Sequence, residues 1–138
     1  MNQTISGAIG LPWSAAVTLL ALLLHLATTA IVGRARRRYG VRAPAVTGNE
    51  HFERAYRVQM NTIEQMMFFL PALWLCAVFL SDPAAAVAGL VWVTARALYA
   101  AAYLTEPVSR APWVVVSMLA QGALFLGAAA GVVRAVIA

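Results

Sequence analysis

The stretch LPWSAAVTLLALLLHLATTAIVG, residues 11–33, decides the fold class, because it contains no charged residue. A helix needs about 20 apolar residues to cross a bilayer, and this stretch is long enough. A cleavable signal peptide has its basic residues before a shorter apolar core. Here the basic residues follow the apolar run, as Arg34, Arg36, Arg37 and Arg38. We therefore expect residues 11–33 to be a retained membrane span.

The composition of the whole chain agrees with a membrane protein. Of its 138 residues, 62% are hydrophobic and only 11% are charged, whereas soluble domains are about a quarter charged. The sequence predicts a single domain, residues 1–138, that is an all-α integral membrane protein with a bundle of four transmembrane helices. We expect the helices at about residues 11–33, 49–80, 84–104 and 112–136. Residues 34–48 contain five arginines, a proline and two glycines, which favour a loop.

The arginines indicate how the helices cross the membrane. All ten basic residues are arginines. Seven lie in the first connection and at the start of the second helix, Arg110 lies in the third connection, and Arg134 lies on the opposite side. The positive-inside rule places the arginine-rich side in the cytoplasm. We expect a multi-pass protein, in a bacterial inner membrane, with both termini outside and any site opening to the cytoplasm.

The sequence does not indicate a nucleic-acid partner or a metal site. The net charge of +5 invites comparison with nucleic-acid-binding proteins, but those need a solvated basic face, so we expect no nucleic acid partner. The single cysteine, Cys76, and the absence of a Cys/His cluster with zinc spacing predict no metal site.

Polar side chains within membrane spans are costly and usually face the bundle or a watery cavity. In the second helix, Arg54, Arg57, Asn61 and Glu64 fall within an arc of about 80° at 100° per residue. In the third helix, Arg96, Tyr99 and Tyr103 share one face.

These residues also have structural interpretations. The polar residues of the second helix could form a solvated face with an ion pair inside the helix, such as Arg54 with Glu50 or Arg57 with Glu64. Alternatively, Glu64 could pair with Arg96 across two helices. The tyrosines could belong to an interfacial belt. His25 is expected to form a helix–helix hydrogen bond rather than to act in catalysis.

A longer pattern covers the second helix. Residues 53–64 read E-R-x-x-R-x-Q-x-N-x-x-E, and Leu73-Trp74 follow. With Ala95-Arg96 and Arg110-Ala111-Pro112, this pattern resembles the MAPEG family, the membrane-associated proteins in eicosanoid and glutathione metabolism. The resemblance extends over nearly the whole chain and weakens in the fourth helix.

The resemblance implies a MAPEG-like homotrimer with glutathione as co-substrate between adjacent subunits. Arg110 matches the arginine that activates the thiol, so it is the predicted catalytic residue. Arg96 is expected to form a structural ion pair or to support the site. The residues that match glutathione-binding positions are Arg36, Arg37, Arg57, Gln59, Asn61, Glu64, Tyr99 and Tyr103.

The implied activity is that of a microsomal glutathione transferase or peroxidase. A glutathione thiolate would attack a lipophilic electrophile from the bilayer or reduce a hydroperoxide. Gln65 stands where eicosanoid-forming members have an aromatic residue, and the third connection has Glu106, Pro107 and a single arginine. These departures favour a general detoxification enzyme over a specialised synthase. The alternatives are a non-catalytic scaffold and a small four-helix transporter, although transporters of that kind have a carboxylate in the first span, where this chain has none.

Overall fold

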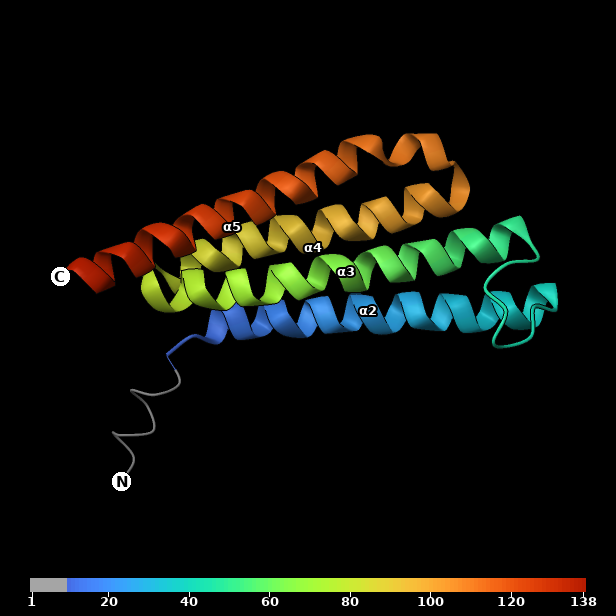
Figure 1. The fold of residues 1–138 in the computed structure, drawn as a ribbon, viewed down its shortest axis with the longest axis horizontal. Coiled ribbons are helices and arrows are strands. Elements are labelled where there is room, and N and C mark those ends of the chain that lie inside the picture. Colours follow the sequence, from blue (N-terminus) through green and yellow to red (C-terminus); the bar gives the residue numbers. More distant parts are fainter. Residues whose placement is uncertain (1–9) are drawn as a thin grey trace, which may run out of the picture.

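The computed structural model describes residues 10–138, which form four α-helices lying side by side (Figure 1). They are α2 (Pro12–Tyr39), α3 (Glu50–Phe79), α4 (Asp82–Thr105) and α5 (Ala111–Ile137), with a short 3-10 helix, η1 (Pro107–Arg110), before α5. Each of the four is long and apolar enough to cross a membrane. The predicted all-α class with four membrane-spanning helices is confirmed, and the described residues contain no strand.

The two ends of the bundle differ in the number of arginines that they contain. The start of α2 and the end of α5 lie at one end, and the α2–α3 connection and η1 lie at the other (Figure 1). The second end therefore contains most of the arginines. We refer to it below as the basic end.

The predicted end of the first helix is wrong. We expected residues 34–48 to be a loop, but α2 continues through the basic cluster to Tyr39. Arginine is a good helix former, and cations in the last turn interact favourably with the helix dipole. The helix ends only at Gly40, whose backbone is left-handed with φ of 67°, a conformation that glycine adopts without steric cost.

The start of α3 follows from its local sequence. The side-chain oxygen of Asn49 accepts hydrogen bonds from the backbone N–H groups of His51 and Phe52, at 3.0 and 3.2 Å. Glu50 and Glu53 lie in the first turn, where negative charge is favoured. The predicted bounds of α3, α4 and α5 all lie within two residues of those observed.

The start of α2 is capped by a residue from another helix. Leu11 provides no side-chain cap. Instead the Asp82 carboxylate at the start of α4 accepts hydrogen bonds from the backbone N–H groups of Trp13 and Ser14, at 3.1 and 2.8 Å. A carboxylate at a helix N-terminus satisfies free N–H groups and interacts favourably with the dipole. This contact joins α2 to α4 at the end opposite the basic end.

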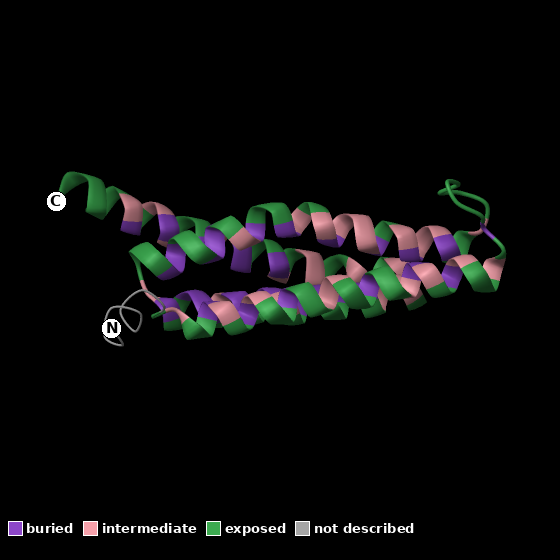
Figure 2. Cartoon of the chain, turned by 90° about the horizontal axis from the view of Figure 1, so that it is seen from below, coloured by how far each residue is buried: buried purple, intermediate pink, exposed green. Residues whose placement is uncertain are grey.

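The bundle packs through small and aromatic residues. The rings of Phe69 and Trp92 stack with centroids 3.9 Å apart. A side chain on Gly89 would clash with Val17 and Leu73, so three helices meet closely at this glycine. Buried residues occupy the facing surfaces of the helices, and exposed residues extend along their outer faces (Figure 2). Many of those exposed residues are large and apolar, as expected for a surface in contact with lipid.

Candidate functional site

A polar cavity of about 530 Å³ lies towards the basic end, between α3, α4, η1 and α5. We call it the site cavity. From α3 it receives Arg57, Asn61 and Gln65, which are spaced four residues apart and so share one face of the helix. Its other lining residues are Arg96, Tyr99, Tyr103, Arg110, Val114, Ser117 and Met118.

One wall of the site cavity is a ladder of alternating guanidinium groups and phenol rings. Arg96 Cζ lies 4.1 Å from the centroid of the Tyr99 ring. The centroids of Tyr99 and Tyr103 are 5.7 Å apart, and Arg110 Cζ lies 4.6 Å from the Tyr103 centroid. Both distances from a guanidinium carbon to a ring are within cation–π range. The ladder places Arg110, on η1, beside the tyrosines of α4.

Arg96 is the buried end of this ladder. It is only 2% exposed, and its Nη2 lies 3.4 Å from Thr62 Oγ1, to which it donates a hydrogen bond. Its Nε atom is buried and has no hydrogen-bond partner in the structure. A guanidinium in this position can donate further hydrogen bonds to a ligand in the cavity.

The ion pair between Glu64 and Arg96, one of the alternatives left open by the sequence, does not form in the described residues. Within residues 10–138 the ion pair that forms is Arg54 with Glu50, inside α3, as one of the sequence alternatives expected; Arg57 and Glu64 do not pair. Thr62, not Glu64, faces Arg96, because residues two apart in a helix point about 200° apart. The site cavity is therefore lined by three arginines and by no carboxylate.

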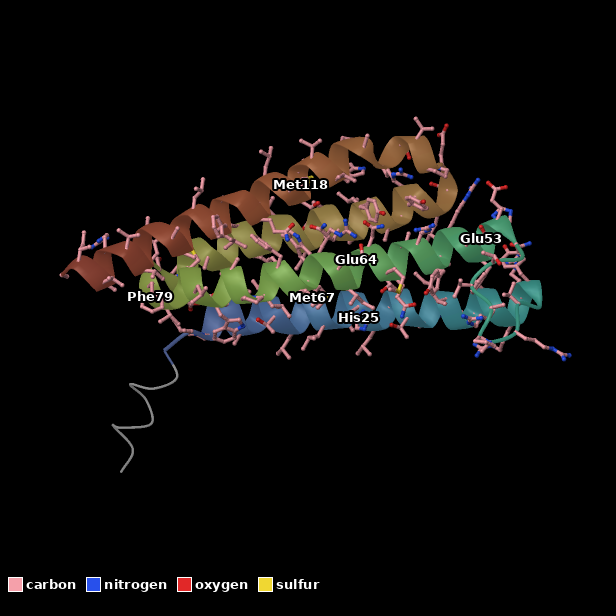
Figure 3. The ribbon with its side chains drawn as sticks, in the orientation of Figure 1. His25, Glu53, Glu64, Met67, Phe79 and Met118 are labelled. Atoms are coloured by element: carbon pink, nitrogen blue, oxygen red, sulfur yellow. The ribbon has the colours of Figure 1, made fainter. Side chains whose placement is uncertain are left out.

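Glu64 lies just outside the site cavity, in a groove between α3 and α5. This groove contains Glu64, Phe68, Gln121 and Phe125, and it shares Gln65 and Met118 with the site cavity. Figure 3 labels Glu64 on α3 and Met118 on α5. Phe68 and Phe125 also line the next groove, of about 330 Å³, whose other lining residues are apolar. A path from polar to apolar surface thus runs along α3 and α5.

Three of the predicted glutathione-binding residues lie away from this cavity. Arg36 Nη1 donates to the backbone oxygens of Ala45 and Val41, at 2.8 and 3.4 Å, and its guanidinium covers the Phe52 ring. Gln59 Nε2 donates to Thr29 Oγ1 on α2 at 3.0 Å. Arg37 is exposed near the end of α2.

The predicted residues therefore fall into two groups. Those of the first group line the site cavity or the groove that adjoins it: Arg57, Asn61, Glu64, Tyr99, Tyr103 and Arg110. The residues of the second group, Arg36, Arg37 and Gln59, lie on α2 or on the side of α3 that faces α2. A single chain does not bring the two groups together.

Gln65 and Ser117 line the site cavity but were not predicted from the sequence. For Gln65 a signal existed, because it continues the spacing of four from Arg57 through Asn61. Ser117 is the first polar residue in α5.

The expected interhelical hydrogen bond of His25 does not form in the described residues, where its Nδ1 atom is buried without a partner.

A model of the MAPEG family matches residues 14–130. The chain belongs to the MAPEG family. The match includes the whole of α3 and α4, most of α2 and α5, and every residue that lines the site cavity.

This MAPEG protein is similar in sequence to proteins from mammals and from a cyanobacterium. It is 39% identical to leukotriene C4 synthase of Bos taurus, over 80% of this chain and 79% of the relative. It is 38% identical to microsomal glutathione S-transferase 2 of Homo sapiens, over 62% of this chain and 58% of the relative. It is also 47% identical to an uncharacterized protein of Synechocystis sp., over 84% of this chain and 85% of the relative.

Proposed function

We propose that this MAPEG protein is a glutathione-dependent membrane transferase and that glutathione binds in the site cavity. The observation that carries the proposal is the charge of that cavity, which has Arg57, Arg96 and Arg110 on its walls and no carboxylate. Glutathione has two carboxylates and one ionisable thiol. Guanidinium groups bind carboxylates in a two-point geometry. Three cations thus match three potential anions.

The remaining groups of glutathione also find partners. The amide of Asn61 can hydrogen-bond the peptide groups, and the hydroxyls of Tyr99 and Tyr103 can donate to an anionic oxygen or sulfur. Glu64, in the adjoining groove, can accept hydrogen bonds from the glutathione ammonium. The volume of about 530 Å³ lies in the range of small-molecule sites.

Arg110 is the group proposed to activate the thiol. A free thiol has a pKa near 8.5, and a neighbouring guanidinium lowers that pKa because it favours the anion. A pKa lower by about two units corresponds to about 2.7 kcal/mol and makes the thiolate the main form at neutral pH. Arg110 lies on η1 at the open end of the ladder, stacked on Tyr103, where it can reach a sulfur in the cavity.

The second substrate is proposed to be a lipophilic electrophile that enters from the bilayer. The groove along α3 and α5 leads from the site cavity to apolar surface, and it would seat an apolar substrate beside the thiolate. The sulfur would attack the electrophilic carbon and form a C–S bond, and the leaving group would depart with the displaced electron pair.

We propose that the site is completed by an adjacent subunit of a homotrimer. Arg36, Arg37 and Gln59 match glutathione-binding positions but lie away from the site cavity of their own chain. In a closed symmetric ring, one face of each subunit contacts a different face of the next, so this second group can reach a neighbour's cavity. The basic end, with its many arginines, is proposed to face the cytoplasm of a bacterial cell.

The first experiment compares Arg110→Ala with the unmodified protein. Conjugation of glutathione to a small aromatic halide is followed by absorbance, and glutathione binding by calorimetry. We expect turnover to fall about 10- to 100-fold while glutathione still binds, because the lost cation stabilises mainly the thiolate. The pH profile of kcat/KM should shift to higher pH in the Arg110→Ala variant, because the glutathione thiol then has a higher pKa. Arg110→Lys should restore part of the activity.

The matched control is Arg134→Ala, which removes an arginine from the other end of the bundle and should leave turnover unchanged. The proposal is wrong if millimolar glutathione does not bind. Normal glutathione binding without turnover on a broad panel of electrophiles would indicate the scaffold alternative, and proton-coupled efflux from vesicles would indicate the transporter. A parallel assay with cumene hydroperoxide as the second substrate tests whether the same thiolate also reduces hydroperoxides.

A further inference from the structure

A second cavity, of about 260 Å³, lies at the basic end between α2, the start of α3 and the end of α4. It shares no lining residue with the site cavity. Its polar lining residues are Arg34, Arg38, Tyr39 and His51, and Ile31 and Leu104 are among its apolar ones. We call it the rim cavity.

The polar wall of the rim cavity is cationic and ordered by stacking. Arg34 and Arg38 are one helical turn apart on α2, and both are exposed. Within residues 10–138 neither of them forms an ion pair. Arg38 Cζ lies 5.7 Å from the centroid of Tyr39, and the Tyr39 ring stacks on His51 with centroids 5.4 Å apart. Two unpaired guanidinium groups thus face an opening with no carboxylate on its walls.

The position of the rim cavity indicates what kind of anion it receives. The uncharged run of α2 ends at Gly33, and Arg34 follows, so the cavity lies where the helix leaves the hydrocarbon. Ile31 and Leu104 are half-buried on its walls, and Ile31 lies one turn further into the membrane than Arg34. A soluble phosphate would use only the cationic wall. A phospholipid would place its phosphate on the arginines and the start of an acyl chain on the apolar wall.

We propose that the rim cavity binds the phosphate of an anionic phospholipid, separately from the chemistry of the site cavity. Basic pockets between transmembrane helices bind anionic headgroups, and the guanidinium pair suits phosphate oxygens. Because the cavity is lined by three helices, a bound lipid would also hold the ends of α2, α3 and α4 together and stabilise the folded state.

The test uses the purified full-length protein in detergent, titrated with dioleoylphosphatidylglycerol or dioleoylphosphatidylcholine. Native mass spectrometry counts bound lipid, and thermal unfolding reports stabilisation. We expect one tightly bound phosphatidylglycerol per chain and weaker binding of phosphatidylcholine. Arg34→Gln and Arg38→Gln should each weaken phosphatidylglycerol binding about fivefold.

The matched control is Arg42→Gln, which removes the same charge from the adjacent connection but not from the rim cavity; its binding should stay within about twofold of the original. Equal weakening by Arg42→Gln would overturn the proposal in favour of general surface charge. Competition by inorganic phosphate or glycerol 3-phosphate at the same concentration would overturn the lipid assignment. Absence of any tightly bound phosphatidylglycerol would also overturn it, as expected if a second chain covers the cavity.

Discussion

Gly131 shows how closely α5 approaches the end of α3. A side-chain carbon at this position would lie 2.6 Å from the backbone oxygen of Phe79, and a backbone atom cannot move aside as a flexible side chain can. We therefore expect Gly131→Ala to destabilise the protein by about 1–3 kcal/mol, measured as a lower midpoint of thermal unfolding in detergent. Gly122→Ala is the matched control, because that glycine of the same helix faces open space.

Contacts between individual side chains could be predicted from the sequence only in part. Spacing alone places Arg57 and Asn61 on one face of α3, and both line the site cavity. The same spacing could not decide whether Thr62 or Glu64 meets Arg96, since each successive residue turns by about 100°. The rotation of α3 against α4 decides it, and that rotation depends on packing of residues such as Phe69 against Trp92.

Among the elements, α2 depends on α4 for its start. Asp82→Ala removes the only side-chain acceptor seen for the N–H groups of Trp13 and Ser14 in the described residues. We expect a loss of about 1–2 kcal/mol in the free energy of unfolding and faster hydrogen exchange in the first turn of α2. Asp82→Asn keeps an acceptor oxygen and should give an intermediate effect. Unchanged exchange in that turn of the Asp82→Ala variant would contradict this prediction.

Helix bounds were predictable where a cap or a proline marks them, and not where charge alone had to be interpreted. Asn49 correctly marks the start of α3. Residues 34–48 were expected to form a loop because they contain five arginines, a proline and two glycines, but α2 continues through the first of these residues to Tyr39 and ends at the turn of Gly40. The Arg36 side chain returns to the backbone oxygens of Val41 and Ala45, a contact that local composition cannot reveal.

At the scale of the whole molecule, the fold class could be predicted because a bilayer fixes the length and composition of a span. The candidate site could be predicted only in part. The resemblance to the MAPEG family predicts residues of both groups, but one chain brings only the first group to the site cavity and its adjoining groove. Whether the second group serves the same chemistry depends on how copies of the chain meet, which is a property of the assembly.

Mixed assemblies test this point. Arg110→Ala alters the first group, and Arg37→Ala with Gln59→Ala alters the second, so we expect each variant alone to have little activity. If every site takes its two groups from different subunits, random co-assembly in equal amounts leaves about one quarter of the sites intact. Conjugation activity should then rise to about a quarter of the unmodified level on co-expression, but not on mixing separately purified, non-exchanging assemblies. Activity no higher than that of the two variants alone would contradict the proposal that each site takes its two groups from different subunits. Full activity of the Arg37→Ala, Gln59→Ala protein would exclude the second group from catalysis altogether.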